Sequence, residues 1–273
     1  MPICTGHRAM PSNDHRSSVT RPPTFATWRP FVVGVLLGLA FLVALGTATA
    51  QGIDHAPFDA LLKANVKSGV VNYSGFQGNA AFKKYVEDLG KPAKLDSKAE
   101  QLAFYINAYN ALAIEGILQG LSPSTFLGRA RYFKVKDWPL NGQSTTLDNL
   151  EHKIIRPLGE SRIHFAVICA SKSCPFLRAE AYTAAKLDAQ LDEQARQFLN
   201  DPFRNRFEKT TKTAHLSEIF KWFEEDFQAP GSTQKYVARY VADAEVSRAL
   251  ADDGYRIEWI AYDWSLNGSP PKP

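Results

Sequence analysis

Residues 104–114 read FYINAYNALAI and lie within a predicted helix that spans residues 100–119. This helix is apolar nearly all round, so we expect it to be central and to pack on several sides. Asn107 and Asn110 lie three residues apart on the same side of it, which predicts buried, hydrogen-bonded amides. Two roles stay open for these asparagines: they hold loop backbone in place, or they form part of a binding pocket.

Shorter elements are expected around this helix. Apolar residues at helical spacing predict further helices at 58–66, 79–89, 187–198 and 233–250. Short strands are expected at 70–73, on either side of 209–212 and at 255–262, and Asn141-Gly142 predicts a small hairpin or irregular loop within 131–145. This irregular mix predicts one α+β domain with a small, mostly antiparallel sheet packed with several helices.

The segment 162–177, RIHFAVICASKSCPFL, gathers one of the six histidines and both cysteines that lie outside the N-terminal leader. Its near-continuous apolar part, 163–169, predicts a buried strand. The small and polar residues that follow predict a loop that displays Lys172, Ser173 and Cys174, and functional residues are common on such loops. We therefore expect a polar site here, with Lys172 and Ser173 as candidate binding residues.

The two thiols differ in their expected reactivity. Because a strand alternates its faces, His164 and Cys169 should point in opposite directions and should not pair directly unless a bulge intervenes. Cys174 follows Lys172 closely and precedes a proline suited to the first turn of a helix, and both features favour a lowered thiol pKa. Cys174 is thus the preferred nucleophile, with Cys169 as the other candidate and His164 as the candidate base.

A disulfide is the main alternative for these thiols. Two cysteines in an exported chain are expected to oxidise, and the spacing C-x4-C can close a loop. A free reactive thiol and a pair of buried or reversibly redox-active thiols stay open as well. The cysteines and histidines show no recognised zinc spacing, so we expect no metal and no cofactor.

Glu151 is the candidate carboxylate of this site. Thr146 is a plausible N-cap for a helix in which Glu151 occupies the apolar stripe, where a carboxylate must find a partner or shift its pKa upward. It either orients His164 or a substrate amine, or it forms a buried ion pair with Arg156 or Arg162.

Three further polar or aromatic residues are interpreted as architecture. We expect the carboxylates of Asp226 and Asp263 to cap backbone donors, and we expect Trp264 to fill the core.

Residues 1–50 have the pattern of a secretory signal. Four arginines precede an uncharged apolar run, 31–45, and the segment ends in Ala48-Thr49-Ala50, which predicts cleavage after Ala50. The run is shorter than the roughly twenty apolar residues that cross a bilayer. We expect a periplasmic or secreted protein, and the alternative is an uncleaved segment that anchors the chain in the inner membrane.

The rest of the chain is close to neutral, with 28 Lys and Arg against 27 Asp and Glu. Without clustered basic runs it is not expected to bind nucleic acid, and we expect membrane contact only through an uncleaved N-terminal segment. The expected partner is a small molecule, a peptide or an envelope component. We place one domain at 51–268 and a disordered tail at 269–273.

Several motifs in order resemble the family known as domain of unknown function 547 (DUF547). They lie at residues 66–73, 104–112, 146–156, 163–175, 220–227 and 262–267. The resemblance implies a secreted bacterial protein or a module of a larger one, and it suggests no cofactor. By analogy alone the fold is compared with papain-like or transglutaminase-like cysteine enzymes.

Two functions follow as hypotheses. One is cysteine-dependent acyl transfer or amide hydrolysis through Cys174 or Cys169, with His164 as base and Glu151 as the residue that orients it. The other is a noncatalytic module that binds a peptide or an envelope polymer and contains a structural disulfide.

Overall fold

The computed structural model describes residues 52–272 and confirms an α+β fold. The α-helices are α1 (Ala56–Asn65), α2 (Ala80–Leu89), α3 (Lys98–Leu118), α4 (Phe126–Arg129), α5 (Leu147–Asn149), α6 (Leu187–Leu199), α7 (Ile219–Trp222), α8 (Thr233–Ala238) and α9 (Ala244–Ala251). The strands are β1 (Val66–Lys67), β2 (Val70–Asn72), β3 (Trp138–Leu140), β4 (Gln143–Thr145), β5 (Arg206–Glu208), β6 (Thr213–Ser217), β7 (Arg256–Ile260) and β8 (Gly268–Ser269). Two π-helical segments, η2 (Ala130–Val135) and η3 (Leu150–Ile155), continue α4 and α5.

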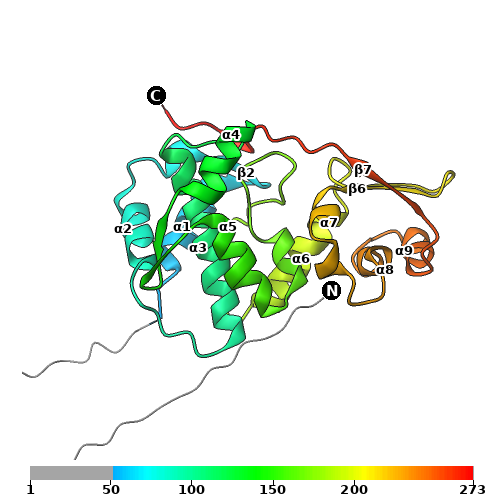
Figure 1. The fold of residues 1–273 in the computed structure, drawn as a ribbon, viewed down its shortest axis with the longest axis horizontal. Coiled ribbons are helices and arrows are strands. Elements are labelled where there is room, and N and C mark those ends of the chain that lie inside the picture. The colour runs from blue at the N-terminus through cyan, green and yellow to red at the C-terminus, as the bar shows by residue number, and fades with distance from the viewer. Residues whose placement is uncertain (1–51, 273) are drawn as a thin grey trace, which may run out of the picture. The chain divides into compact units, whose positions relative to one another are not determined.

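Helix α3 is central, as predicted. The Ser97 side chain caps its first turn and the Glu100 carboxylate accepts a hydrogen bond from the Ser97 N–H, which fixes where the helix begins. Most of its side chains are buried, and helices α1, α2, η3 and α6 contact it or its neighbours (Figure 1). The first apolar core therefore forms around α3, because a helix that is apolar all round buries its side chains only when other elements pack against every side of it.

A second apolar core is rich in aromatic side chains. Phe165, Phe198, Phe220 and Phe227 pack together with ring centroids 4.8–6.3 Å apart. Strands β5, β6 and β7 border this core, with β5 antiparallel and β7 parallel to β6. Figure 1 shows α7, α8 and α9 grouped with β6 and β7, away from α1 and α2.

The predicted turn at Asn141-Gly142 joins β3 to β4. Both residues have positive φ, 49° and 75°, which is the geometry of the tight hairpin turns that Asn-Gly favours. The predicted hairpin is therefore confirmed at 138–145, whereas residues 131–135 of the same segment are π-helical.

The strand predicted at 163–169 is wrong. The chain forms the 3-10 helix η5 (Ser161–Phe165) and then an irregular turn. The Asn110 side chain binds the Ala166 carbonyl and the Ile168 N–H, both at 2.9 Å, so these backbone groups are satisfied without a neighbouring strand. The continuous apolar run reflects burial on several sides, which a strand and an irregular buried segment share.

Residues 268–272 are held in place, whereas the composition predicted a disordered tail at 269–273. Strand β8 pairs in parallel with β2, and the Ser74 hydroxyl donates to the Pro270 carbonyl at 3.3 Å. Lys272 and Gln77 exchange two hydrogen bonds. The predicted signal sequence lies outside the described residues, and within 52–272 none of the helices is long and apolar enough to cross a membrane.

Candidate functional site

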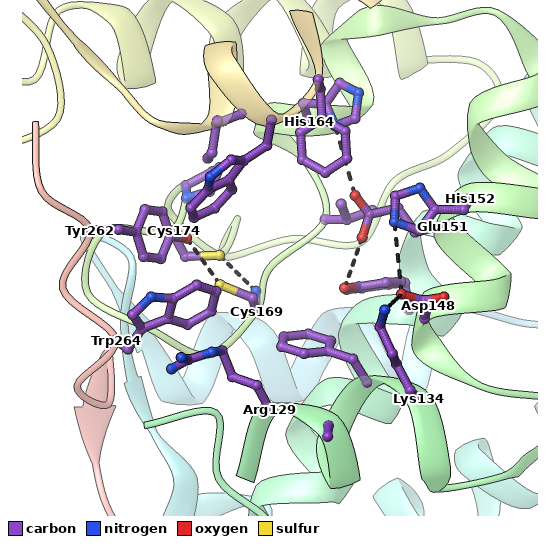
Figure 2. Close-up of a pocket in the computed structure, with 18 of the residues that line it drawn as sticks. Arg129, Lys134, Asp148, Glu151, His152, His164, Cys169, Cys174, Tyr262 and Trp264 are labelled. Atoms are coloured by element: carbon purple, nitrogen blue, oxygen red, sulfur yellow. Dashed lines mark hydrogen bonds and ion pairs between the residues drawn. The ribbon is translucent and has the colours of Figure 1, made fainter. Parts of the chain in front are cut away.

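A pocket of about 420 Å³ is lined by residues from both apolar cores. It brings together Glu151 of η3, His164 of η5 and Cys169 of the turn that follows η5. Trp222 of α7 forms part of its aromatic wall. Trp264, which follows β7, lies on the same wall (Figure 2). Three of the four predicted catalytic candidates thus meet at one surface, and the fourth, Cys174, lines it from a buried position.

Cys169 has the environment of an ionisable thiol. Its Sγ lies 2.9 Å from the Ser171 hydroxyl and 3.1 Å from the Tyr262 hydroxyl. Burial by itself raises the pKa of this thiol, but hydrogen bonds from the Cys174 thiol, Ser171 and Tyr262 outweigh it and lower the pKa to about 7. A thiolate at neutral pH is therefore stabilised by three donors.

Backbone geometry at the next residue sets this arrangement. Ala170 is fully buried and has φ 59°, in the left-handed region that residues other than glycine rarely adopt. The turn there places the Ser171 hydroxyl beside Cys169. Backbone conformations of this kind cost free energy and persist only where the surrounding structure holds them, and they are concentrated at functional sites.

Cys174 is buried, whereas we predicted an accessible nucleophile on a loop. Its side chain is 2% exposed, and its Sγ accepts a hydrogen bond from the Cys169 N–H at 2.6 Å. Burial and then the neighbouring Cys169 raise the pKa of this thiol well above its ordinary value. Both thiols are free, so the expected disulfide is absent from the structure.

The loop after Cys169 is held against the domain by hydrogen bonds and is not presented to solvent as we predicted. The Arg204 guanidinium donates to the carbonyls of Lys172 and Cys174, both at 2.7 Å, and the buried Ser173 hydroxyl accepts from the Asp263 N–H at 2.8 Å. The Lys172 side chain is exposed. Neither Lys172 nor Ser173 lines the pocket, so the structure places both proposed binding residues outside it.

His164 is fixed by a carboxylate that sequence reasoning misread. Its Nε2 lies 2.6 Å from Asp226, and its ring stacks on Phe223 with centroids 4.0 Å apart. The hydrogen bond from His164, and then the one from Arg156, hold the pKa of Asp226 well below its ordinary range although burial opposes them. Asp226 is thus an ion-pair partner of Arg156 and a hydrogen-bond partner of His164, and not a backbone cap.

The contact with Asp226 determines which ring nitrogen of His164 carries the hydrogen. Burial lowers the pKa of the imidazole more than Asp226 raises it, so the ring is neutral. Because a carboxylate only accepts, Nε2 carries the hydrogen. The unprotonated Nδ1 then faces Glu151, at 3.9 Å from its Oε1.

Among residues 52–272, no arginine forms an ion pair with Glu151. Arg156 pairs with Asp226, and Arg162 pairs with Glu160 at 2.8 Å, so the ion pair that we considered for Glu151 is wrong. The Tyr109 hydroxyl donates to Glu151 at 3.2 Å. Burial raises the pKa of Glu151 to about 7, the upward shift expected of a carboxyl group on an apolar stripe.

This shift predicts a pH-dependent effect of Glu151→Gln on stability. The folded pKa lies above the value of 4.5 for an unperturbed glutamate, so wild-type stability is lost as the pH rises from about 4.5 through 7. Glutamine does not titrate and can still accept from Tyr109. We expect urea unfolding to show the variant gaining up to about 3 kcal/mol relative to wild type between pH 5 and pH 8.

Glu160→Gln is the control of opposite sign. Burial of Glu160 is outweighed by hydrogen bonds from Arg162, which lower its pKa, so its contribution to stability is present at neutral pH and is lost on acidification. This variant should therefore fall further below wild type as the pH rises. Parallel pH dependences for the two variants would contradict the assignment of a raised pKa to Glu151.

The two buried asparagines of α3 hold loop backbone in place. Asn107 exchanges two 2.8 Å hydrogen bonds with the backbone of Tyr182, and Asn110 binds Ala166 and Ile168. Neither amide lines the pocket, so of the two roles left open the structure shows the positioning role.

Two other histidines among residues 52–272 have partners of their own. His152 lines the pocket beside Arg156, and His215 of β6 lies between Glu208 at 3.0 Å and Glu258 at 3.4 Å. Within 52–272 no group of three or more His, Cys, Asp or Glu side chains is placed to hold a metal ion.

Sequence reasoning missed Ser171, Tyr109 and Tyr262. Tyr262 begins a motif on which the family resemblance rests, and that was the one available signal for it. Ser171 lies only two residues from the chosen Ser173, but only the left-handed turn at Ala170 decides which serine meets the thiol. Trp264 was expected in the core and instead lies half-exposed on the pocket wall.

Comparison with known proteins gives one match. Residues 92–199 match the model of the family described as "Protein of unknown function, DUF547", a range that contains Glu151, His164 and both described cysteines and ends before Asp226 and Tyr262. No curated protein and no solved structure matches the chain. Three of the six motifs that resemble this family, at 104–112, 146–156 and 163–175, lie within the matched range, so the match supports a DUF547 domain over residues 92–199 of this chain.

Proposed function

We propose that this chain is an exported, cysteine-dependent enzyme that transfers or hydrolyses an acyl group, with Cys169 as the nucleophile. The observation that carries the proposal is the setting of one thiol. Cys169 lines the pocket, receives hydrogen bonds from Ser171 and Tyr262 and has a pKa lowered to about 7. The thiolate is the nucleophilic form of cysteine, and about half of such a thiol is ionised at neutral pH.

Glu151 supplies the second catalytic function in this proposal. A general acid or base works best when its pKa lies near the working pH, and burial brings the pKa of Glu151 to about 7. It lines the same pocket as Cys169. His164 and Asp226 act as positioning residues, because the Asp226 contact leaves the unprotonated His164 Nδ1 directed at the carboxyl group.

The reaction then has two balanced steps. The Cys169 thiolate attacks the carbonyl carbon, a sulfur–carbon bond forms, and the bond from that carbon to the leaving nitrogen or oxygen breaks as the leaving group takes a proton from Glu151. In the second step water, or an acceptor amine or alcohol, attacks the thioester and gives a proton to the Glu151 carboxylate. The thiolate is released and the initial state returns.

The free thiols bear on the rival hypothesis. The noncatalytic module was expected to contain a Cys169–Cys174 disulfide, and both cysteines are free. Export is inferred from the leader at 1–50 alone. The substrate proposed is a small molecule, a peptide or an envelope component that carries an acyl group.

Acylation of Cys169 by p-nitrophenyl butyrate tests the proposal. Intact-mass and peptide analysis of quenched reactions should find one butyryl group on Cys169. Cys169→Ala should lose the adduct and reduce nitrophenolate release by at least about 100-fold. Turnover by this variant at the wild-type rate would sink the proposal.

Two further variants separate the roles. Cys174→Ala should keep the adduct on Cys169, formed more slowly because one hydrogen bond to the thiolate is lost. Glu151→Gln should slow the acylation of Cys169 by butyryl p-nitroanilide, measured in the first turnover, by roughly 100-fold, but the acylation by the nitrophenyl ester only a few-fold, since nitrophenolate leaves without a proton. Equal effects on both substrates would remove Glu151 from the acid–base role.

A further inference from the structure

Arg129 is a cation on the pocket wall without an acidic partner among residues 52–272. It is the last residue of α4, and its Nη1 donates to the Pro123 carbonyl at 3.2 Å. The guanidinium carbon lies 4.6 Å from the centroid of the Trp264 ring. Figure 2 shows the side chain reaching toward Trp264. The group is thus held in one orientation and keeps donors that none of the described residues uses.

The other charged groups on the pocket wall have partners of their own, and the Cys169 thiolate accepts hydrogen bonds from Cys174, Ser171 and Tyr262. Lys134 faces Asp148 at 3.7 Å, and Glu151 accepts from Tyr109. The described structure therefore gives the pocket one guanidinium whose charge no carboxylate neutralises. An anion brought by a ligand is the partner that this arrangement lacks.

The surroundings of Arg129 strengthen such a contact. Trp222 and Tyr262 lie against Trp264, with ring centroids 5.7 and 4.5 Å from it, and Phe126 and Phe133 line the pocket as well. Aromatic walls exclude water, and a charge pair is stronger where the local dielectric is low. A planar guanidinium also matches the two oxygens of a carboxylate.

We infer that Arg129 binds a carboxylate on the acyl donor, so that the substrate combines an apolar body with an anionic group. This inference rests on the proposed function, because it concerns the substrate of the same pocket. A volume of about 420 Å³ accommodates a ligand of small-molecule size. Arg129 is therefore a specificity-determining residue.

Two alkylating reagents of nearly equal shape test the inference without requiring turnover. Iodoacetate carries a carboxylate and iodoacetamide is neutral, and each forms a sulfur–carbon bond with Cys169 as iodide leaves. The full chain is treated with each reagent, and the rates at Cys169 are measured by peptide mapping. Arg129→Gln should lower the ratio of the iodoacetate rate to the iodoacetamide rate by roughly tenfold, because the anion loses its partner.

Arg131→Gln is the matched control. Arg131 is exposed and does not line the pocket, and its loss changes the net charge by the same amount. Its ratio should stay at the wild-type value. Arg129→Lys keeps the charge but loses the planar fork, so its ratio should fall less, and it serves if the glutamine variant does not fold.

Protection experiments separate the possible sources of the carboxylate. Glutarate and a short peptide with a free C-terminal carboxylate are each tested for slowing iodoacetamide at Cys169, and protection by either that is lost in Arg129→Gln supports the inference. Equal ratios in wild type, Arg129→Gln and Arg129→Lys overturn it and leave the proposed function standing. Failure of both reagents to label Cys169 overturns both.

Discussion

Iodoacetamide is expected to alkylate Cys169 at least about 100-fold faster than Cys174 at pH 7. The thiol of Cys169 has a pKa lowered to about 7, whereas burial and the neighbouring thiol raise that of Cys174 far above its ordinary value. Roughly half of the first thiol and under about 1% of the second is then ionised, and only the thiolate reacts. Cys174 is also almost fully buried, which slows its reaction further.

The pH dependence of the alkylation rate shows whether the pKa of Cys169 is lowered or raised. Because the deprotonated form reacts, the Cys169 rate should rise with pH with a midpoint at about 7, and peptide mapping separates it from Cys174 and Cys4. Tyr262→Phe removes one donor and should move the midpoint upward. In urea the two thiols should react alike. A midpoint near the ordinary value of about 8.5 in the folded wild type would falsify the assignment of Cys169 as an activated thiol.

Asn110→Ala is expected to destabilise the domain by about 2–5 kcal/mol. The substitution removes two hydrogen bonds of 2.9 Å and leaves the Ala166 carbonyl and the Ile168 N–H buried without partners. Each unsatisfied buried group costs roughly 1–3 kcal/mol. Urea unfolding monitored by tryptophan fluorescence measures the loss.

Asn107→Ala is the matched comparison for this prediction. Asn107 lies on the same helix and makes two hydrogen bonds of the same kind to Tyr182, so its loss should cost a similar amount of stability. Only Asn110 holds the segment that leads to Cys169. The alkylation midpoint of Cys169 should therefore shift in Asn110→Ala and stay constant in Asn107→Ala, and a shift in both would reduce Asn110 to a general stabilising residue.

Much of the fold was predictable from local pattern. The central helix, the Thr146 cap of α5 and the hairpin turn at Asn141 all occur as expected. These features depend on neighbours within a few residues, such as side-chain oxygens on N–H groups of the next turn. The one strand predicted from apolar composition alone, 163–169, failed because composition reports burial and not pairing.

The site was predictable in place but not in detail. The sequence located Glu151, His164 and the two cysteines, and three of these reach the pocket wall as polar groups. It ranked the thiols in the wrong order, since the order depends on Tyr262, 93 residues from Cys169, and on a turn at Ala170. No local rule gives the direction in which a side chain points after an irregular turn.

By itself, the sequence determined the α+β class, the buried helix α3 and the segment in which chemistry is to be sought. Hydrophobic periodicity, helix caps and turn residues depend only on residues that are close together in the sequence. Only the tertiary structure decided that Cys169 is the ionisable thiol, that Asp226 holds His164 and that Arg129 faces the pocket. Ionisation depends on burial and on partners brought together from distant segments, and those are properties of the packed chain alone.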